Sequence, residues 1–341
     1  MPLDNDSMSF AVYSHTVLLR SDGVAVACGC NDGGECDIPR LETGQTYTRV
    51  SAGNTYTVLL RNDGIAVTCG ENEFGRCEIP RLDNGQTYTR VSARDAHTVL
   101  LRSDGLAIAC GYNGDGQCDI PRLEDGQSYT EVSAGADHTV LLRSDGLAVA
   151  CGRNDEGECD IPRLEDGQIY TQVSAGCTHT VLLRNDGVAV ACGENEYDQC
   201  EIPRLDNGQT YTRVSAGDTH TVLIRSDGLA IACGSNFYGQ CEIPRLADGQ
   251  SYTEVSAGVL HTVLLRSDGL ALACGANDDG RCDIPELVDG MTYKLQVIHA
   301  WSNKRPAFML RYLTSLPVCP LAAFLHGPCP EQQFRIIVEF L

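Results

Sequence analysis

The chain has 341 residues, a formal net charge of −21 and 18 cysteines. The tail from Met291 holds five basic and two acidic residues, so the negative charge belongs to the part before it. Nucleic acid and anionic membranes both require a basic surface, and we expect neither as a direct partner. The charge is typical of a soluble chain whose copies repel one another, which predicts a monomer. It also fits attraction of a basic protein.

The N-terminal stretch has neither a basic start nor an apolar run, so it is not typical of a signal peptide. We therefore expect a reducing compartment, the cytoplasm or the nucleus. Ser9–Val12 resembles an incomplete copy of the first strand in the unit that follows.

A 41-residue unit is repeated seven times without a gap. An Asp-Gly pair fixes the register of the copies, and its glycines are Gly23, Gly64, Gly105, Gly146, Gly187, Gly228 and Gly269. Such an array has one supersecondary unit per repeat, and no unit can bury its apolar side alone.

Each unit predicts three short strands and no helix, because no segment has a 3.6-residue period. In the copy from Tyr129 to Leu164, the expected strands are Tyr129–Ala134, His138–Arg143 and Leu147–Cys151. The Ser-Asp-Gly before Leu147 predicts a tight hairpin turn, since Gly146 tolerates positive φ. The segment after Cys151 has the composition of a loop.

Seven copies of a three-stranded unit predict an all-β fold, a closed seven-bladed β-propeller with short antiparallel blades. Closure removes the exposed sheet edges of an open array. We expect the propeller to span residues 1–298, with Thr292–Ile298 pairing beside His15–Arg20 to close the ring. Residues 299–341 form a tail of unassigned structure.

The tail contains an apolar stretch from Ala307 to Leu325. Arg311, Pro317 and Pro320 interrupt it, so a membrane-spanning helix is the less favoured interpretation.

The motif Val-Ser-Ala-Gly-x-x-His-Thr, followed by Asp-Gly and then by Cys-Gly-x-Asn-x-x-Gly-Gln, resembles the regulator of chromosome condensation repeat. The resemblance covers residues 9–290 approximately. The family usually has Trp where all seven copies here have Cys. The short, constant repeats are similar to those of the bacterial β-lactamase inhibitory propeller. Because family members include exchange factors, chromatin binders, ubiquitin-ligase modules, an ultraviolet receptor and inhibitors, the resemblance implies a fold and a binding role.

Fourteen cysteines fall into two rings. The first is Cys28, Cys69, Cys110, Cys151, Cys192, Cys233 and Cys274; the second is Cys36, Cys77, Cys118, Cys159, Cys200, Cys241 and Cys282. Core packing of reduced thiols is the favoured interpretation. A disulfide across each loop, such as Cys28 to Cys36, is the alternative, and the spacing is unlike that of a zinc site.

The histidines form another ring, with Tyr56 in the second copy. They are His15, His97, His138, His179, His220 and His261. A catalytic group is needed once, with partners that break the symmetry. We therefore interpret the ring as structural, each imidazole bonding a neighbouring loop, and expect no catalytic residue, metal or cofactor.

Two windows vary between copies while their flanks do not: the pair before the His, and the residues after Cys-Gly. In an antiparallel meander both windows fall at one end of the blades, opposite the Asp-Gly turns. Variable loops on a constant scaffold are typical of a binding surface. Drift after duplication is the alternative.

The candidate partner-binding residues all come from the second window. The aromatic candidates are Phe74, Tyr112, Tyr197, Phe237 and Tyr238, since aromatic side chains often anchor interfaces. The acidic candidates are Glu73, Asp155, Glu156 and Glu196, expected to set association rate and salt dependence.

The favoured function is a non-enzymatic scaffold that binds a protein, possibly basic, through the variable-loop face. Two alternatives follow from the resemblance: the substrate-binding portion of a ubiquitin ligase, and a GTPase exchange regulator. The constant repeats leave no room in the ring for the inserted wedge that exchange activity in the family depends on.

Overall fold

The computed structural model describes residues 15–83, 85–206, 208–287 and 290–294. Ser9–Val12, residues 295–298, the predicted boundary at 298/299 and the apolar stretch from 307 to 325 lie outside these ranges. Among the residues described, no helix is both long and apolar enough to cross a bilayer.

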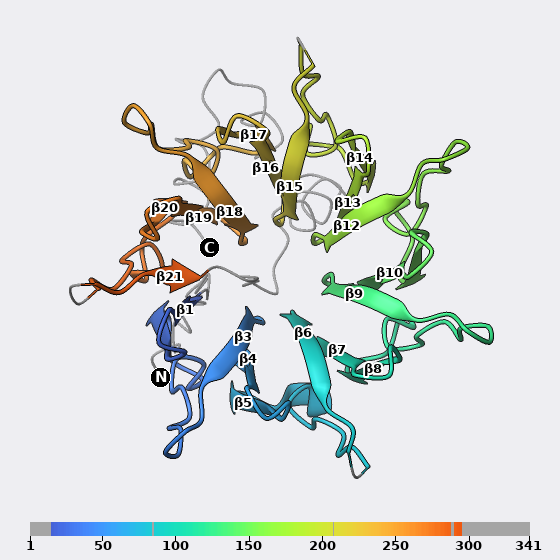
Figure 1. Ribbon diagram of the computed structural model, residues 1–341, viewed down its shortest axis with the longest axis vertical. Coiled ribbons are helices and arrows are strands. Elements are labelled where there is room, and N and C mark those ends of the chain that lie inside the picture. Colours follow the sequence, from blue (N-terminus) through green and yellow to red (C-terminus); the bar gives the residue numbers. More distant parts are fainter. Residues whose placement is uncertain (1–14, 84, 207, 288–289, 295–341) are drawn as a thin grey trace, which may run out of the picture. The chain divides into compact units, whose positions relative to one another are not determined.

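The described strands form seven antiparallel sheets of three strands, arranged as blades around a centre (Figure 1). The inner strands are β21 (Tyr293–Lys294), β3 (Tyr47–Ala52), β6 (Tyr88–Arg94), β9 (Tyr129–Ala134), β12 (Tyr170–Ala175), β15 (Tyr211–Ala216) and β18 (Tyr252–Ala257). The middle strands are β1 (His15–Arg20), β4 (Tyr56–Arg61), β7 (His97–Arg102), β10 (His138–Arg143), β13 (His179–Arg184), β16 (His220–Arg225) and β19 (His261–Arg266). The outer strands are β2 (Ala25–Gly29), β5 (Ala66–Gly70), β8 (Ala107–Gly111), β11 (Ala148–Gly152), β14 (Ala189–Gly193), β17 (Ala230–Gly234) and β20 (Ala271–Gly275).

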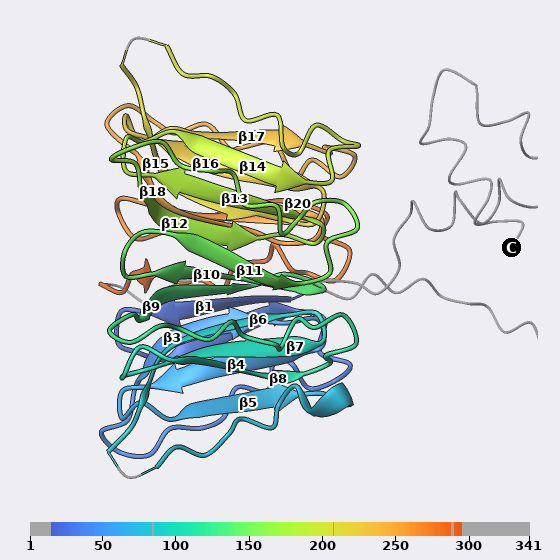
Figure 2. The ribbon, with the colours of Figure 1, turned by 90° about the vertical axis from the view of Figure 1, so that its right-hand side faces the viewer.

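The predicted all-β, seven-bladed propeller is therefore confirmed. We number the blades from 1, which contains β21, β1 and β2, to 7, which contains β18, β19 and β20. One short 3₁₀ turn, η1 (Glu73–Gly75), follows β5 in blade 2 and lies at one end of the strands (Figure 2).

Blade 1 combines strands from the two ends of the described chain. Leu19 of β1 pairs with Lys294 of β21, and Arg20 pairs with Tyr293. The expected closing strand is thus confirmed for Tyr293–Lys294. Because β1 is covered on this side, it presents no open edge there.

The strand register places the two variable windows together. His138 of β10 lies opposite Gly152 of β11, so the segment before the His and the segment after Cys-Gly leave the same end of the blade. The hairpin turn at Gly146, whose φ is 82°, lies at the other end. We call these ends the loop face and the turn face.

The core lies between neighbouring blades, because every middle strand is apolar on both sides. Val140 and Leu142 of β10 pack against blade 5, where Tyr170 and Val173 are buried. The residue between them, Leu141, packs against blade 3. Successive side chains of a strand point to opposite faces, and this explains why the repeat carries a continuous Val-Leu-Leu run.

The two cysteine rings belong to the outer strands and the loops that follow. None of the described cysteines forms a disulfide, and those of the rings are half-buried. The thiol of Cys151 faces the carbonyl of Gln117 in blade 3 at 3.8 Å, and burial raises its pKa to about 12. The favoured packing role fits this environment. The rings are less buried than expected, because an outer strand has solvent on one side.

Candidate functional site

The histidine ring links each blade to the next. His138 Nε2 lies 2.9 Å from Thr180 Oγ1, and the same bond recurs around the ring until His261 reaches Thr16 of blade 1 at 3.0 Å. Thr180 donates its only hydroxyl hydrogen to the carbonyl of Glu158 at 2.8 Å. The imidazole must therefore donate through Nε2, which fixes its tautomer. The ring is structural, as predicted, although its partner is a strand residue and not a loop.

Burial keeps these imidazoles neutral. The side chains are completely buried, and desolvation lowers the pKa of His138 to about 3. Within the described residues, the Nδ1 atoms of all six have no hydrogen-bond partner. A neutral, buried imidazole bonded to the next blade fits the predicted structural role.

Blade 2 makes the same link by different chemistry. The Tyr56 hydroxyl donates to the carbonyl of His97 at 2.6 Å. The guanidinium of Arg76 lies 5.0 Å from the centre of the Tyr56 ring and donates to Thr55 Oγ1 at 2.6 Å. Arg76 replaces a Gln or Glu found in five of the copies. Tyr56 and Arg76, which both differ from the residue in most copies, therefore lie in contact with each other.

The aromatic candidates lie on the loop face and pair across neighbouring blades. Phe74 of blade 2 and Tyr112 of blade 3 meet edge to face, with ring centres 5.2 Å apart. Tyr197 of blade 5 and Phe237 of blade 6 do the same at 6.1 Å. Phe74, Phe237 and Tyr238 are 61%, 57% and 52% exposed. Tyr197 is half-buried. The structure thus gathers the five candidates into two exposed patches.

The acidic candidates are exposed on the same face. Glu73 directly precedes Phe74 in η1, and Glu196 directly precedes Tyr197. Asp155 accepts a hydrogen bond from Arg153 Nε at 2.8 Å, and Glu156 follows it. Blade 4, which supplies this second pair, carries no aromatic residue in its loop.

The first variable window does not belong to this exposed surface, contrary to our expectation. The leading residue turns inward in five of the six pairs: Asn54, Asp95, Ala136, Cys177 and Val259 are buried, whereas Asp218 is half-buried. Ala136, Cys177 and Val259 pack together although they come from three different blades. The inner strands converge on the axis, so their ends fill the centre of the ring.

Arg94 closes the same end of the central channel. It occupies a position that is Gly in the five other copies that follow an inner strand, and it is completely buried. Its Nη1 lies 3.3 Å from the carbonyl of Ala175 and 3.2 Å from that of Ala216, in blades 5 and 6. The neighbouring Asp95 has a pKa raised to about 7, first by burial and then by the charge of Asp137.

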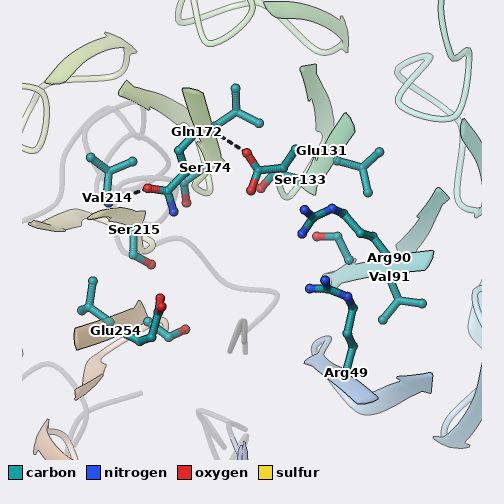
Figure 3. A pocket seen from close by; sticks show the side chains of 15 residues that line it. Arg49, Arg90, Val91, Glu131, Ser133, Gln172, Ser174, Val214, Ser215 and Glu254 are labelled. Carbon is teal, nitrogen blue, oxygen red and sulfur yellow. Dashed lines mark hydrogen bonds between the residues drawn. The ribbon is translucent and has the colours of Figure 1, made fainter. Parts of the chain in front are cut away.

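The channel is hollow toward the turn face. A cavity of about 90 Å³ lies there, lined by the third residues of the inner strands and by a ring of serines (Figure 3). Five of the third residues line it, namely Arg49, Arg90, Glu131, Gln172 and Glu254. The equivalent Arg213 is exposed and does not belong to the lining. Our sequence reasoning missed this position, although the variable x of Tyr-Thr-x-Val-Ser is visible in the repeat.

Hydrogen bonds hold part of this ring in place. Glu131 accepts the N–H of Val173 at 3.2 Å, and Gln172 accepts that of Val214 at 3.1 Å. Arg213 and Glu254 form a two-point ion pair with bonds of 3.0 and 3.1 Å. In the described part of the chain, no group of three or more His, Cys, Asp or Glu side chains is arranged to hold a metal ion.

Three of the seven repeats match the family model of the regulator of chromosome condensation (RCC1) repeat, at residues 129–158, 211–240 and 252–281. The predicted repeat is thereby confirmed. No curated protein sequence matches the chain.

Solved structures of similar fold come from yeast, human and plant proteins. Prp20p of Saccharomyces cerevisiae is 16% identical over 89% of this chain and 97% of its own, with a TM-score of 0.65. Human WBSCR16 is 16% identical over 77% and 87%, with a TM-score of 0.61. The ectodomain of the Arabidopsis thaliana receptor kinase ACR4 is 18% identical over 76% and 89%, with a TM-score of 0.58. At these identities the likeness establishes the fold alone.

Proposed function

We propose that this seven-bladed propeller of regulator of chromosome condensation repeats is a non-enzymatic scaffold that binds a protein partner on its loop face. The observation that carries the proposal is the pair of exposed aromatic patches, Phe74–Tyr112 and Tyr197–Phe237. Exposed aromatic clusters on a rigid frame are typical anchors of protein interfaces, because little side-chain entropy is lost when they are covered.

The backbone at Phe74 supports this assignment. Its φ is 57°, in the left-handed region that bulky residues rarely adopt. Such a conformation is unfavourable and often marks a functional position. Here it holds an exposed ring beside Tyr112 instead of folding it onto the blade.

The charge around the patches favours a basic partner segment. Glu73 and Glu196 each stand next to a patch residue, and Asp155 and Glu156 lie on the same face. The structure of Prp20p is described together with its binding properties to Gsp1p and histones. For the present chain we propose a basic protein segment, met in the cytoplasm or the nucleus, with the acidic residues speeding association at low salt.

The test is partner capture from a soluble extract, quantified by mass spectrometry. The test variant carries Ala at Phe74, Tyr112, Tyr197, Phe237 and Tyr238. The matched control removes three exposed aliphatic residues from the turn face, Leu106→Ala, Leu147→Ala and Leu229→Ala, and also leaves the charge unchanged.

We expect the aromatic variant to lose the captured partner and the leucine variant to retain it. Replacing an anchor aromatic commonly costs about 2 kcal/mol or more of binding free energy. Retention by the aromatic variant together with loss by the leucine variant would place the interface on the turn face and refute the proposal.

A further inference from the structure

Two arginines stand side by side at the turn-face end of the central channel. Arg49 of β3 and Arg90 of β6 occupy the same repeat position in neighbouring blades, and both line the cavity. Figure 3 shows their guanidinium groups on one side of it, with Glu254 across the space. The pKa of Arg49 is lowered, first by burial and then by the positive charge of Arg90.

No carboxylate pairs with these two side chains within the described residues. Arg90 donates from Nε to the carbonyl of Thr130 at 2.8 Å, which leaves its terminal amino groups for another acceptor. Arg213, at the equivalent position of blade 6, is neutralised by Glu254. Like charges placed together in a half-buried site are unfavourable unless something of opposite charge compensates them.

Glu131 is the nearest built-in counter-charge, and it is only a partial one. It attracts both Arg90 and Arg49, but one of its oxygens is committed to the N–H of Val173. Burial also raises the pKa of its carboxyl, so its charged form is disfavoured. Two guanidinium groups and one such carboxylate leave the local charge positive in a chain that is otherwise acidic.

The cavity wall supplies further donors. The hydroxyl oxygens of Ser133, Ser174 and Ser215 each accept a backbone N–H of the next blade, at 2.9, 3.0 and 2.9 Å. Within the described residues these hydroxyls donate to no other group, so they can donate at the cavity wall. An oxyanion accepts hydrogen bonds and offers none, so it matches a site of this kind.

We propose that this channel mouth binds a small oxyanion, a carboxylate or phosphate group held between Arg49 and Arg90 above the serine ring. The planar guanidinium fork suits both groups. A space of about 90 Å³ suits one phosphate or a short dicarboxylate. The site lies on the face opposite the aromatic patches and is independent of them.

The experiment is calorimetric titration of the full chain with inorganic phosphate and with succinate, at constant ionic strength set with chloride. The two anions distinguish the two sources of the ligand group. Arg49→Gln with Arg90→Gln should weaken binding at least about tenfold for each charged hydrogen bond lost. The matched control, Arg122→Gln with Arg163→Gln, removes the same two positive charges from exposed positions outside the cavity lining and should change binding by less than about twofold.

A second variant decides the question without touching either arginine. Glu131→Gln keeps an acceptor for Val173 and removes the competing negative charge, so it should tighten binding of the anion. Unchanged or weaker binding by Glu131→Gln would overturn the proposal. So would equal losses in the control variant and in the Arg49→Gln, Arg90→Gln variant, or failure of both anions to bind the unaltered chain. None of these results would bear on the loop face.

Discussion

The hydrogen bond between His138 and Thr180, which links two blades, leads to a prediction for Thr180→Val. Valine has nearly the same shape as threonine but lacks its hydroxyl. That hydroxyl accepts from His138 Nε2 at 2.9 Å and donates to the carbonyl of Glu158 at 2.8 Å. All three groups meet where Thr180 and His138 are completely buried. Valine therefore leaves one donor and one acceptor without a full partner in a site that excludes water. A buried polar group left unsatisfied costs about 1–3 kcal/mol, so we expect a loss of about 2–4 kcal/mol in the free energy of unfolding.

The assay is urea denaturation followed by far-ultraviolet circular dichroism. Thr171→Val, in β12 of the same blade, is the matched control because its hydroxyl donates to Leu183 at 3.1 Å but is exposed. Water replaces that bond, and the expected cost is below about 0.5 kcal/mol. If the two variants lose the same free energy, the buried His–Thr link does not stabilise the ring as argued.

Three further predictions concern the ring as a whole. The six histidines have folded pKa values of about 3 to 4, below the unfolded value, so only the unfolded chain takes up protons as the pH falls below about 6.5. Stability should therefore drop steeply from pH 7 to pH 5, and proton uptake on acid unfolding should approach six; a flat profile would contradict the assignment. Native chain should react slowly with a thiol reagent at pH 8 and denatured chain rapidly, since burial holds the pKa of Cys192 near 12. Fast native labelling would refute this. Truncation after Gly290 removes Tyr293 and uncovers the edge of β1. We expect sedimentation to show self-association, or calorimetry to show a lower melting temperature. A truncated chain that stays monomeric with equal stability would argue against closure through β21.

The blades were predictable from the sequence because their signals are local. The Asp-Gly turn and the Val-Leu-Leu run lie within one copy. Seven copies in one register carry the same turn and strand signals. The end of the blade to which each window belongs follows from antiparallel pairing alone, as His138 opposite Gly152 confirms. Contacts between different repeats were not needed for this prediction.

What the sequence did not reveal is which residues point toward the axis of the ring and which point away from it. A repeat shows which residues vary, but not whether a variable residue points outward or toward the axis. Asp95 and Cys177 looked like loop residues and are buried, because seven strand ends converge there. The Thr partner of an imidazole lies 42 residues away, or 245 for His261, and becomes its neighbour only when blades stack. The same applies to Arg49 and Arg90, which look like isolated charges until the ring closes.

Ring closure also explains why one departure from the repeat is linked to another, as in blades 2 and 3. In a closed ring each blade packs on the next, so one exception alters the surroundings of its neighbour. Tyr56 in place of His brings Arg76 beside it, and Arg76 donates to the carbonyl of Asp95 at 3.2 Å. Asp95 directly follows Arg94, which closes the channel.

The same two blades carry Phe74 and Tyr112 at the loop face and Arg49 and Arg90 at the channel mouth. Other departures lie elsewhere in the ring: Arg281 of blade 7 stands at the repeat position of Arg76, and Tyr197 and Phe237 of blades 5 and 6 form the second aromatic patch. A symmetrical scaffold presents a specific site only where its copies differ. The candidate sites on both faces therefore follow from these departures and not from the shared repeat.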